Sequence, residues 1–287
     1  MRVACADSRT VVVDGVRVRY HVAGEGRDGV PVVLLHGGGL DEAALSWRET
    51  FPALADVRPV YALDWPGYGG SDRPDAPYSI PYYRDTLAGF LDAVGLDRVA
   101  LVGVSMGGGA ALGYTLDAPD RVDRLVLVDS YGLGGRIPGG PLGYLFTRLP
   151  FVTDLAWAAL RRSRLLLWVA LRGIVGSGDA VTPALLDDAV RAVRRGDAGR
   201  SFTAFQRSEV GPTGLRTNYV DRLPDLTVPT LVVHGEADPL VPVAWAVRAG
   251  TLIPDATTRV LPDCGHWPPR ECPDRFLELV EEFLLAE

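Results

Sequence analysis

The sequence predicts an α/β protein built on a mostly parallel, doubly wound sheet, with a helical cap inserted into the sheet domain. Three observations support this prediction. Short, almost wholly apolar runs alternate with helical stretches. An alternating segment precedes them near the N-terminus, and a long segment in the second half contains no convincing buried strand.

The N-terminal segment predicts an antiparallel hairpin. Apolar side chains recur at every second position from Val16 to Val22, with two arginines and His21 between them. This two-residue period is typical of a half-buried strand. Val11–Val13 precedes it across Asp14-Gly15, a hairpin turn signal. We therefore expect the charged face, including His21, to lie at the surface.

Five short runs are almost wholly apolar, as expected of strands that are buried on both faces of a parallel sheet. They are Pro31–Leu35, Val60–Leu63, Val99–Val102, Leu125–Val128 and Thr230–Val233. Helices are predicted over Tyr82–Val94, Met106–Leu116 and Asp274–Leu285. The alternation of the two kinds of segment indicates βαβ units.

The predicted cap occupies residues 133–210, and the core domain comprises residues 1–132 and 211–287. The Gly- and Pro-rich stretch Gly132–Gly143 leads into helical sequence that contains eleven Arg and six acidic residues. The cap therefore has a net charge of +5 within a chain of net charge −7, which leaves −12 for the core. Its arginines either solvate helix faces or attract an anionic substrate group or a membrane surface.

Composition excludes several classes of protein. The chain has 287 residues, 47% hydrophobic and 23% charged, which is typical of a globular protein. The acidic balance, 36 acidic against 29 basic residues, argues against nucleic-acid binding. The three cysteines, Cys5, Cys264 and Cys272, are too few for a disulfide framework and favour a reducing compartment.

A cytoplasmic protein is expected. Asp7 and Arg9 interrupt the N-terminus before any apolar signal core can form. The most apolar run, Leu165–Leu171, is far shorter than the ~20 residues that span a bilayer. We expect a small-molecule substrate and no stable membrane insertion. The oligomeric state, including a homodimer, is left open.

The strongest chemical signal is Gly103-Val104-Ser105-Met106-Gly107, a G-x-S-x-G motif between a predicted strand and a predicted helix. A serine on such a tight turn projects its hydroxyl above the strand ends, and the helix N-terminus favours developing negative charge there. The alternative, a Gly-rich turn of a nucleotide-binding fold, lacks the G-x-G-x-x-G spacing and the acidic ribose partner. Ser105 is therefore the predicted nucleophile.

A second signal is the run His36-Gly37-Gly38-Gly39, which directly follows an apolar strand. Glycines here bring bare backbone N–H groups close to a reacting carbonyl oxygen. The N–H of Gly38, or of Gly39, together with that of Met106 would form an oxyanion hole. A simple strand-ending turn explains one glycine well and three in succession poorly.

The serine needs a base, and His is the side chain whose pKa suits that role near neutral pH. His21 is expected on a surface, and His36 and His234 can be structural residues that bond local backbone. His266 lies in a late loop, Asp263–Pro269, that can reach over the sheet. We predict that His266 is the base.

A carboxylate must orient the base and stabilise the imidazolium. Asp238 follows the strand Thr230–Val233 in a Pro-bounded turn, and the order Ser105, Asp238, His266 matches this class of triad. Asp129, which follows Leu125–Val128, is a rival acid, and Glu236 is a weaker one. Asp238 is the predicted triad acid.

Together these motifs resemble the α/β-hydrolase superfamily, and in particular its cap-bearing serine hydrolases. Asp64–Asp72 is similar to the D-x-P-G-x-G-x-S loop of that group, where it is structural and borders the pocket. The resemblance covers almost the whole chain outside the cap and implies the α/β-hydrolase fold. Ser105 distinguishes the chain from haloalkane dehalogenases and epoxide hydrolases, which use Asp at that position.

The His266-Trp267 pair and the His-Gly-Gly-Gly run are similar to hydrolases that cleave carbon–carbon bonds in aromatic ring-fission products. Leu40-Asp41 departs from the Pro-Gly that usually follows the glycines in those enzymes, so the sub-family is left open.

We therefore expect a carboxylic ester hydrolase of the serine type that needs no cofactor and no metal. Its substrate is expected to be a small or medium ester. The alternatives are a carbon–carbon hydrolase of a dienoic keto acid and a non-catalytic ligand receptor on the same fold.

The predicted substrate pocket includes Gly39, Trp267 and Trp168. Trp168 belongs to a set of large apolar cap residues that are expected either to roof the pocket or to pack the cap on the core. The others are Phe146, Phe151, Trp157, Leu165, Leu166, Val169 and Leu171.

Overall fold

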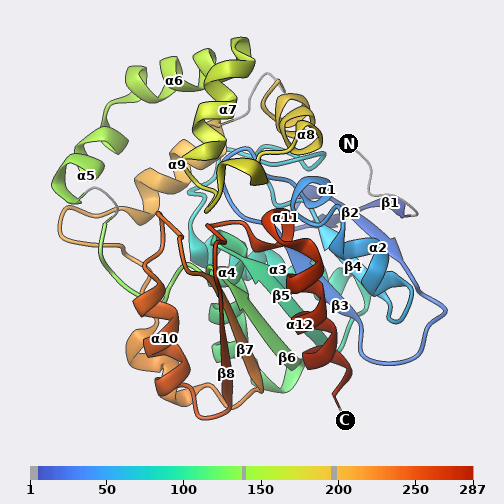
Figure 1. The fold of residues 1–287 in the computed structure, drawn as a ribbon. Helices are drawn as coiled ribbons and strands as arrows, with labels where there is room; N and C mark the ends of the chain where they lie inside the picture. The colour runs from blue at the N-terminus through green and yellow to red at the C-terminus, as the bar shows by residue number, and fades with distance from the viewer. Residues whose placement is uncertain (1–5, 138–139, 195–198, 287) are drawn as a thin grey trace.

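A computed structural model describes residues 6–137, 140–194 and 199–286, so Cys5, Arg195 and Asp197 lie outside the described residues. Its centre is an eight-stranded sheet with strand order β1-β2-β4-β3-β5-β6-β7-β8 (Figure 1). The strands are β1 (Asp7–Val13), β2 (Val16–Ala23), β3 (Val32–Leu35), β4 (Val60–Leu63), β5 (Val99–Val104), β6 (Val122–Val128), β7 (Thr230–Gly235) and β8 (Ala256–Leu261).

The sheet is mostly parallel, as predicted. β1 pairs with β2, and β2 with β4, in antiparallel fashion, whereas every pair from β4 to β8 is parallel. All four residues of β3 and all six of β5 are buried, which explains why these strands are apolar on both faces.

Helices cover both faces of the sheet (Figure 1). One face packs against α3 (Ile80–Val94), α4 (Met106–Asp117) and α10 (Val243–Leu252). The other face packs against α1 (Ala43–Ser46), α2 (Thr50–Ala55) and α12 (Pro273–Leu285). The short helix α11 (Pro268–Glu271) precedes α12. No helix in the described part of the chain is both long enough and apolar enough to cross a membrane.

In the described part of the chain, five α-helices follow β6 before the chain returns to the sheet at β7. They are α5 (Gly140–Arg148), α6 (Pro150–Arg162), α7 (Arg164–Arg172), α8 (Pro183–Val193) and α9 (Arg200–Glu209). Figure 1 shows them gathered at one end of the sheet. Asp188 of α8 is fully buried and pairs with Arg48 at 2.6 Å and Arg270 at 3.3 Å, so ion pairs join these helices to the core.

The expectation that His21 lies at the surface was wrong, because the residue is fully buried. β2 is an internal strand, and His21 lies opposite Ala62 of β4 on the face that α1 and α2 cover. Its neighbour Arg19 is only 16% exposed and pairs with the buried Asp64. Alternation of polar and apolar residues therefore does not mark a solvated face when the polar residues find buried partners.

Candidate active site

Ser105 lies at the turn between β5 and α4 in a strained backbone conformation, with φ of +52°. The flanking glycines are needed because other chain segments pass close to them. A Cβ on Gly103 would lie 2.6 Å from the carbonyl oxygen of Gly107, and one on Gly107 would lie 2.3 Å from that of Leu35. The turn thus holds the hydroxyl at the carboxyl end of the central strand, as the G-x-S-x-G motif predicts.

The three predicted triad residues come together at this point. His266 Nε2 lies 3.0 Å from Ser105 Oγ, and His266 Nδ1 lies 2.7 Å from Asp238 Oδ2. A carboxylate can only accept, so Nδ1 carries the proton and Nε2 is free to accept the serine proton. The His266 side chain is 12% exposed and that of Asp238 is fully buried.

Backbone donors fix the orientation of the Asp238 carboxylate. The N–H groups of Leu240 and Val241 donate to Oδ1, at 2.7 and 3.1 Å, which leaves Oδ2 for His266. Burial acts to raise the pKa of Asp238, but the hydrogen bond to His266 and these backbone donors outweigh it. The pKa of Asp238 therefore lies below its ordinary value, and the group is ionised at neutral pH.

Glu271 holds the loop that carries His266, Asp263–Pro269, which we call the histidine loop. The sequence analysis missed this residue. Its carboxylate accepts the backbone N–H groups of Gly265, Trp267 and Gly176, each at 2.8 Å. Burial raises the pKa of Glu271 against the lowering effect of these donors. The available sequence signal was an acid a few residues beyond the predicted base, in a segment with two prolines.

The glycine loop that follows β3 lies against the nucleophile. A Cβ built on Gly37 would lie 3.5 Å from the Ser105 Cβ. Gly38, Gly39 and Met106 line the same cavity as Ser105, which is where the sequence places the oxyanion hole and part of the pocket.

Asp41 braces the glycine loop from within. Its carboxylate accepts the Gly37 N–H at 2.8 Å and the Ser46 hydroxyl at 2.5 Å, and the Trp267 indole N–H donates to that hydroxyl at 2.9 Å. This chain of bonds joins the glycine loop to the histidine loop. Burial raises the pKa of Asp41. The departure from Pro-Gly at Leu40-Asp41 was its only sign in the sequence.

The two remaining histidines bond local backbone, as the sequence analysis allowed. His36 Nε2 accepts the Trp65 backbone N–H at 3.1 Å, while Nδ1 lies 2.7 Å from the Gly37 carbonyl oxygen. His234 Nε2 lies 2.9 Å from the Val241 carbonyl oxygen. Both side chains are fully buried.

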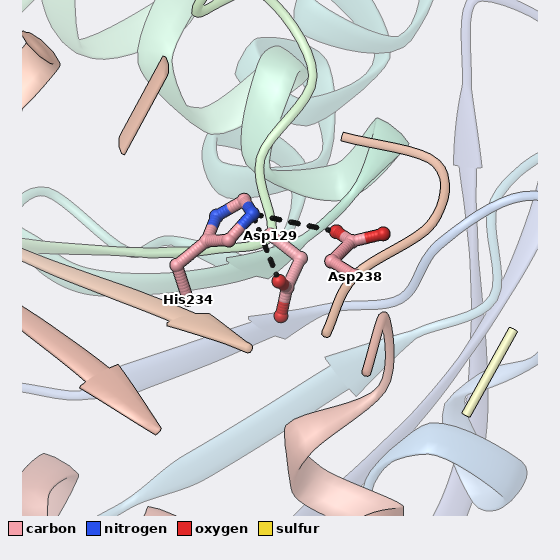
Figure 2. Close-up of side chains that lie close together, drawn as sticks. All are labelled: Asp129, His234 and Asp238. Atoms are coloured by element: carbon pink, nitrogen blue, oxygen red, sulfur yellow. Dashed lines mark ion pairs between the residues drawn. The ribbon is translucent and has the colours of Figure 1, made fainter. Parts of the chain in front are cut away.

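Asp129, the rival acid, lies behind the triad rather than beside its histidine. It follows β6, and its Oδ1 accepts the Gly235 N–H at 2.9 Å. Figure 2 shows Asp129, His234 and Asp238 converging, with His234 Nε2 at 3.4 Å from Asp129 Oδ1 and 3.5 Å from Asp238 Oδ2. The weaker candidate Glu236 is exposed.

A cavity of about 340 Å³ opens above Ser105. Its lining on the core side includes Trp267 and the glycine loop. Trp157 and Leu160 of α6 and Leu171 of α7 line it from the inserted helices, with Ile174, Phe202 and Phe205. Its described lining is therefore dominated by apolar and aromatic side chains.

Trp168 is not among the residues that line this cavity, so its predicted place in the pocket was wrong. On α7 the cavity residues are Ala170 and Leu171, whereas the Trp168 ring is covered by the Arg172 guanidinium at 4.9 Å. Trp157 provides the tryptophan of the roof instead. Five other apolar residues of the predicted set are exposed, namely Phe146, Phe151, Leu165, Leu166 and Val169.

The chain is similar in sequence to known proteins. Residues 30–271 match the sequence family described as the alpha/beta hydrolase fold. A 2-hydroxymuconate semialdehyde hydrolase from Pseudomonas sp. (strain CF600) is 32% identical over 96% of this chain and 93% of its own length.

Two solved structures are similar over most of the chain. A meta-cleavage product hydrolase from Pseudomonas fluorescens IP01 (CumD) superposes with a TM-score of 0.79 at 29% identity, over 96% of each chain. Est816, described as an N-acyl homoserine lactone degrading enzyme, superposes with a TM-score of 0.75 at 30% identity, over 96% of this chain and 100% of the other.

Proposed function

The chain belongs to the α/β-hydrolase fold family, and we propose that it is a serine hydrolase that cleaves a small or medium neutral carboxylic ester through an acyl-enzyme. The observation that carries this proposal is the pair of contacts at His266, 3.0 Å to the Ser105 hydroxyl and 2.7 Å to the Asp238 carboxylate. A hydroxyl becomes a nucleophile only when a positioned base removes its proton.

In the first half of the reaction, the Ser105 oxygen attacks the ester carbonyl carbon while His266 Nε2 takes the serine proton. Asp238 stabilises the imidazolium that forms. The backbone N–H groups of Gly38 and Met106 are proposed to hold the oxyanion, an arrangement in which each donor contributes roughly 10²–10³-fold to the rate. His266 then gives the proton to the departing alcohol, and an acyl group remains on Ser105.

In the second half, water enters and His266 removes its proton, so that hydroxide attacks the acyl carbon. The tetrahedral species collapses, the carboxylic acid leaves, and the proton returns to Ser105. The inserted helices α5–α9 act in this scheme as a cap whose α6, α7 and α9 side chains form the acyl-binding wall.

The cavity favours a neutral substrate. Among the described residues that line it, one is acidic, Asp41, and none is an Arg that could pair with a substrate carboxylate. Burying an unpaired carboxylate in an apolar site costs several kcal/mol. A dienoic keto acid would meet that cost here, whereas a neutral ester would not. The likeness to Est816, whose substrate is described as a lactone and thus a cyclic ester, supports the same reading.

Carbon–carbon bond hydrolysis is the second candidate, because curated relatives at 31–32% identity bear the names of hydrolases of ring-fission products. The same triad and oxyanion geometry serves that reaction. The two candidates therefore differ in whether the cavity must bury a substrate carboxylate.

A matched substrate panel tests this distinction. We expect p-nitrophenyl esters of neutral acyl chains to show kcat/KM about 10²-fold above that of esters whose acyl chain ends in a carboxylate, because the charge loses its solvent without gaining a partner. The readout is nitrophenolate release across a series of chain lengths. Consumption of a 2-hydroxy-6-oxo-dienoate with higher kcat/KM than any neutral ester would assign the chain to carbon–carbon hydrolysis instead.

A further inference from the structure

Asp129 lies directly behind the triad carboxylate, and the mechanism above gives it no task. It is fully buried at the end of β6, with a strained φ of +42°. One carboxyl oxygen of Asp129, one of Asp238 and a ring nitrogen of His234 lie within 4.8 Å of one another. Figure 2 shows the two carboxyl groups approaching the same imidazole.

His234 does not supply a positive charge to this cluster. Its Nε2 lies 2.9 Å from the Val241 carbonyl oxygen, which only accepts, so Nε2 carries the ring proton. Its Nδ1 is buried and has no hydrogen-bond partner among the described residues. Burial lowers the pKa of His234, so the imidazole is neutral. A protonated Nε2 is also unable to bind a metal ion.

The two oxygens of Asp129 have unequal surroundings. Oδ1 accepts the Gly235 N–H at 2.9 Å, whereas Oδ2 is buried and accepts no hydrogen bond from the described residues. An ionised Asp129 would therefore leave one charged oxygen unsolvated. It would also place a second negative charge beside Asp238, and two close buried carboxyl groups do not both ionise at neutral pH.

The other titratable groups that face this cluster do not reverse the argument. Glu271 of α11 adds further negative charge, and Cys264 of the histidine loop is a buried thiol. His266 directs its Nδ1–H at Asp238, so its hydrogen bond goes to that carboxylate and not to Asp129. Burial above all, and then the charge of Asp238, raises the pKa of Asp129 far above its ordinary value.

We propose that Asp129 is a neutral carboxylic acid that directs its proton at Asp238. It thereby positions the triad aspartate and leaves the single negative charge of the pair on Asp238, beside His266. The inference rests on the proposed function only in the role that it gives Asp238. Asp129 itself touches no substrate and acts as a positioning residue.

The pH dependence of stability tests the protonation state without any activity measurement. If the pKa of Asp129 is raised in the folded protein, the unfolded chain loses this proton near pH 4 while the folded chain keeps it. Wild-type stability then falls as pH rises above about 4, relative to a variant without the group. We expect the unfolding midpoint of Asp129→Asn minus that of wild type to increase steadily from pH 4.5 to pH 7.5.

Asn is the matched replacement because it is neutral, can donate a hydrogen bond and tolerates positive φ better than most residues. In infrared spectra at neutral pH, we expect wild type to show a protonated carboxyl band that Asp129→Asn lacks. A constant midpoint difference across this pH range, together with identical carboxyl bands, would show that Asp129 is ionised and overturn the proposal.

Activity measurements then show whether Asp129 acts by positioning Asp238 or by a negative charge of its own. We expect Asp129→Asn to keep kcat within a few-fold of wild type with an unchanged pH profile, and Asp129→Ala, which loses the donor, to lose kcat and shift the profile. Loss of activity in Asp129→Asn with a shifted profile would mean that the negative charge is needed at Asp129. Because the stability and infrared readouts need no turnover, failure of the proposed esterase function would leave them intact.

A separate feature near the active site is a pair of thiols, Cys264 and Cys272, on either side of His266 in the sequence. The sulfur atoms of Cys264 and Cys272 lie 3.0 Å apart, and both are free thiols. Cys264 is buried, whereas Cys272 is partly exposed and precedes the first turn of α12. The thiol of Cys264 and, to a smaller extent, Arg275 lower the pKa of Cys272. A helix N-terminus also favours a thiolate at this position.

We infer that Cys264 and Cys272 form a reversible disulfide that braces the loop carrying His266 when the protein meets a low-molecular-weight disulfide such as oxidised glutathione. The Cys272 thiolate attacks one sulfur of the oxidant and releases one glutathione thiolate. Cys264 then attacks the Cys272 sulfur and releases the second glutathione, and its proton passes to that leaving group. Two protein thiols are oxidised, and one oxidised glutathione becomes two reduced ones.

The test uses the full chain with Cys5→Ser, so that only the pair can react, and Cys272→Ser added as the control. After treatment with oxidised glutathione, we expect the protein to lose two hydrogen atoms by intact mass, to yield one peptide that links positions 264 and 272, and to unfold at a higher temperature than when reduced. A persistent glutathione adduct, or two thiols that still react with an alkylating agent, would refute the disulfide.

Discussion

Replacing Ser105 with alanine is expected to lower kcat for a neutral ester by roughly 10⁶-fold, the size of effect seen when the nucleophile of such a triad is removed. The expectation follows from the geometry, because the serine oxygen is the group 3.0 Å from His266 Nε2. Without it, the His266–Asp238 pair has no nucleophile to activate. The cavity is otherwise unchanged, so KM should change little.

Covalent labelling checks the same assignment by a second route. A fluorophosphonate should modify Ser105 in the wild type, as located by peptide mass, and should leave Ser105→Ala unlabelled. Ser8, an exposed serine of β1, provides a matched Ser→Ala control that should keep both activity and labelling. Tight ligand binding that survives Ser105→Ala, in a wild type without ester turnover, would instead indicate a ligand receptor on this fold.

The sheet and the meeting of the three triad residues could be read from the sequence for one reason. Ser105 and Asp238 each follow a segment that the apolar pattern marks as a strand, and parallel strands end at the same edge of a sheet. His266 was placed there because its late loop can reach over that edge. The residue types and their order then leave few arrangements. The structure gives all three strands, β5, β7 and β8, in neighbouring parts of the sheet.

The inserted helices were less predictable in detail. Their helical character follows from composition and periodicity, but which face of α7 meets the cavity depends on how the helix is docked. Leu171 faces the cavity, whereas Trp168, three residues earlier on the same helix, packs beneath Arg172. The sequence alone does not show which side chains of a cap helix line the cavity, because that depends on how the helix packs against its neighbours.

The bracing carboxylates were missed for a different reason. Asp41 and Glu271 hold the two active-site loops by accepting backbone N–H groups, at Gly37 in one case and at Gly265 and Trp267 in the other. Such partners are defined by the fold of the loop and not by a residue spacing. A buried loop with several unpaired N–H groups needs an acceptor, yet the sequence does not say which acid supplies it.

Replacing Asp238 with asparagine is expected to lower kcat by about 10⁴-fold, the loss associated with a triad carboxylate. The structure gives a specific cause. Leu240 and Val241 donate N–H groups to Oδ1, so the amide oxygen of Asn will occupy that position and its NH₂ will face His266 Nδ1. His266 must then accept at Nδ1 and carry its proton on Nε2, where it cannot take the proton of Ser105.

Asp129→Asn provides the matched control, because it makes the same chemical change in a fully buried carboxyl group beside the first one. Pre-steady-state kinetics should show the acylation burst lost in Asp238→Asn and kept in Asp129→Asn, with both variants folded by circular dichroism. The reverse pattern would assign the triad charge to Asp129. The contrast is informative because the two carboxyl groups share a cluster, and of these two only Asp238 is hydrogen-bonded to His266 among the described contacts.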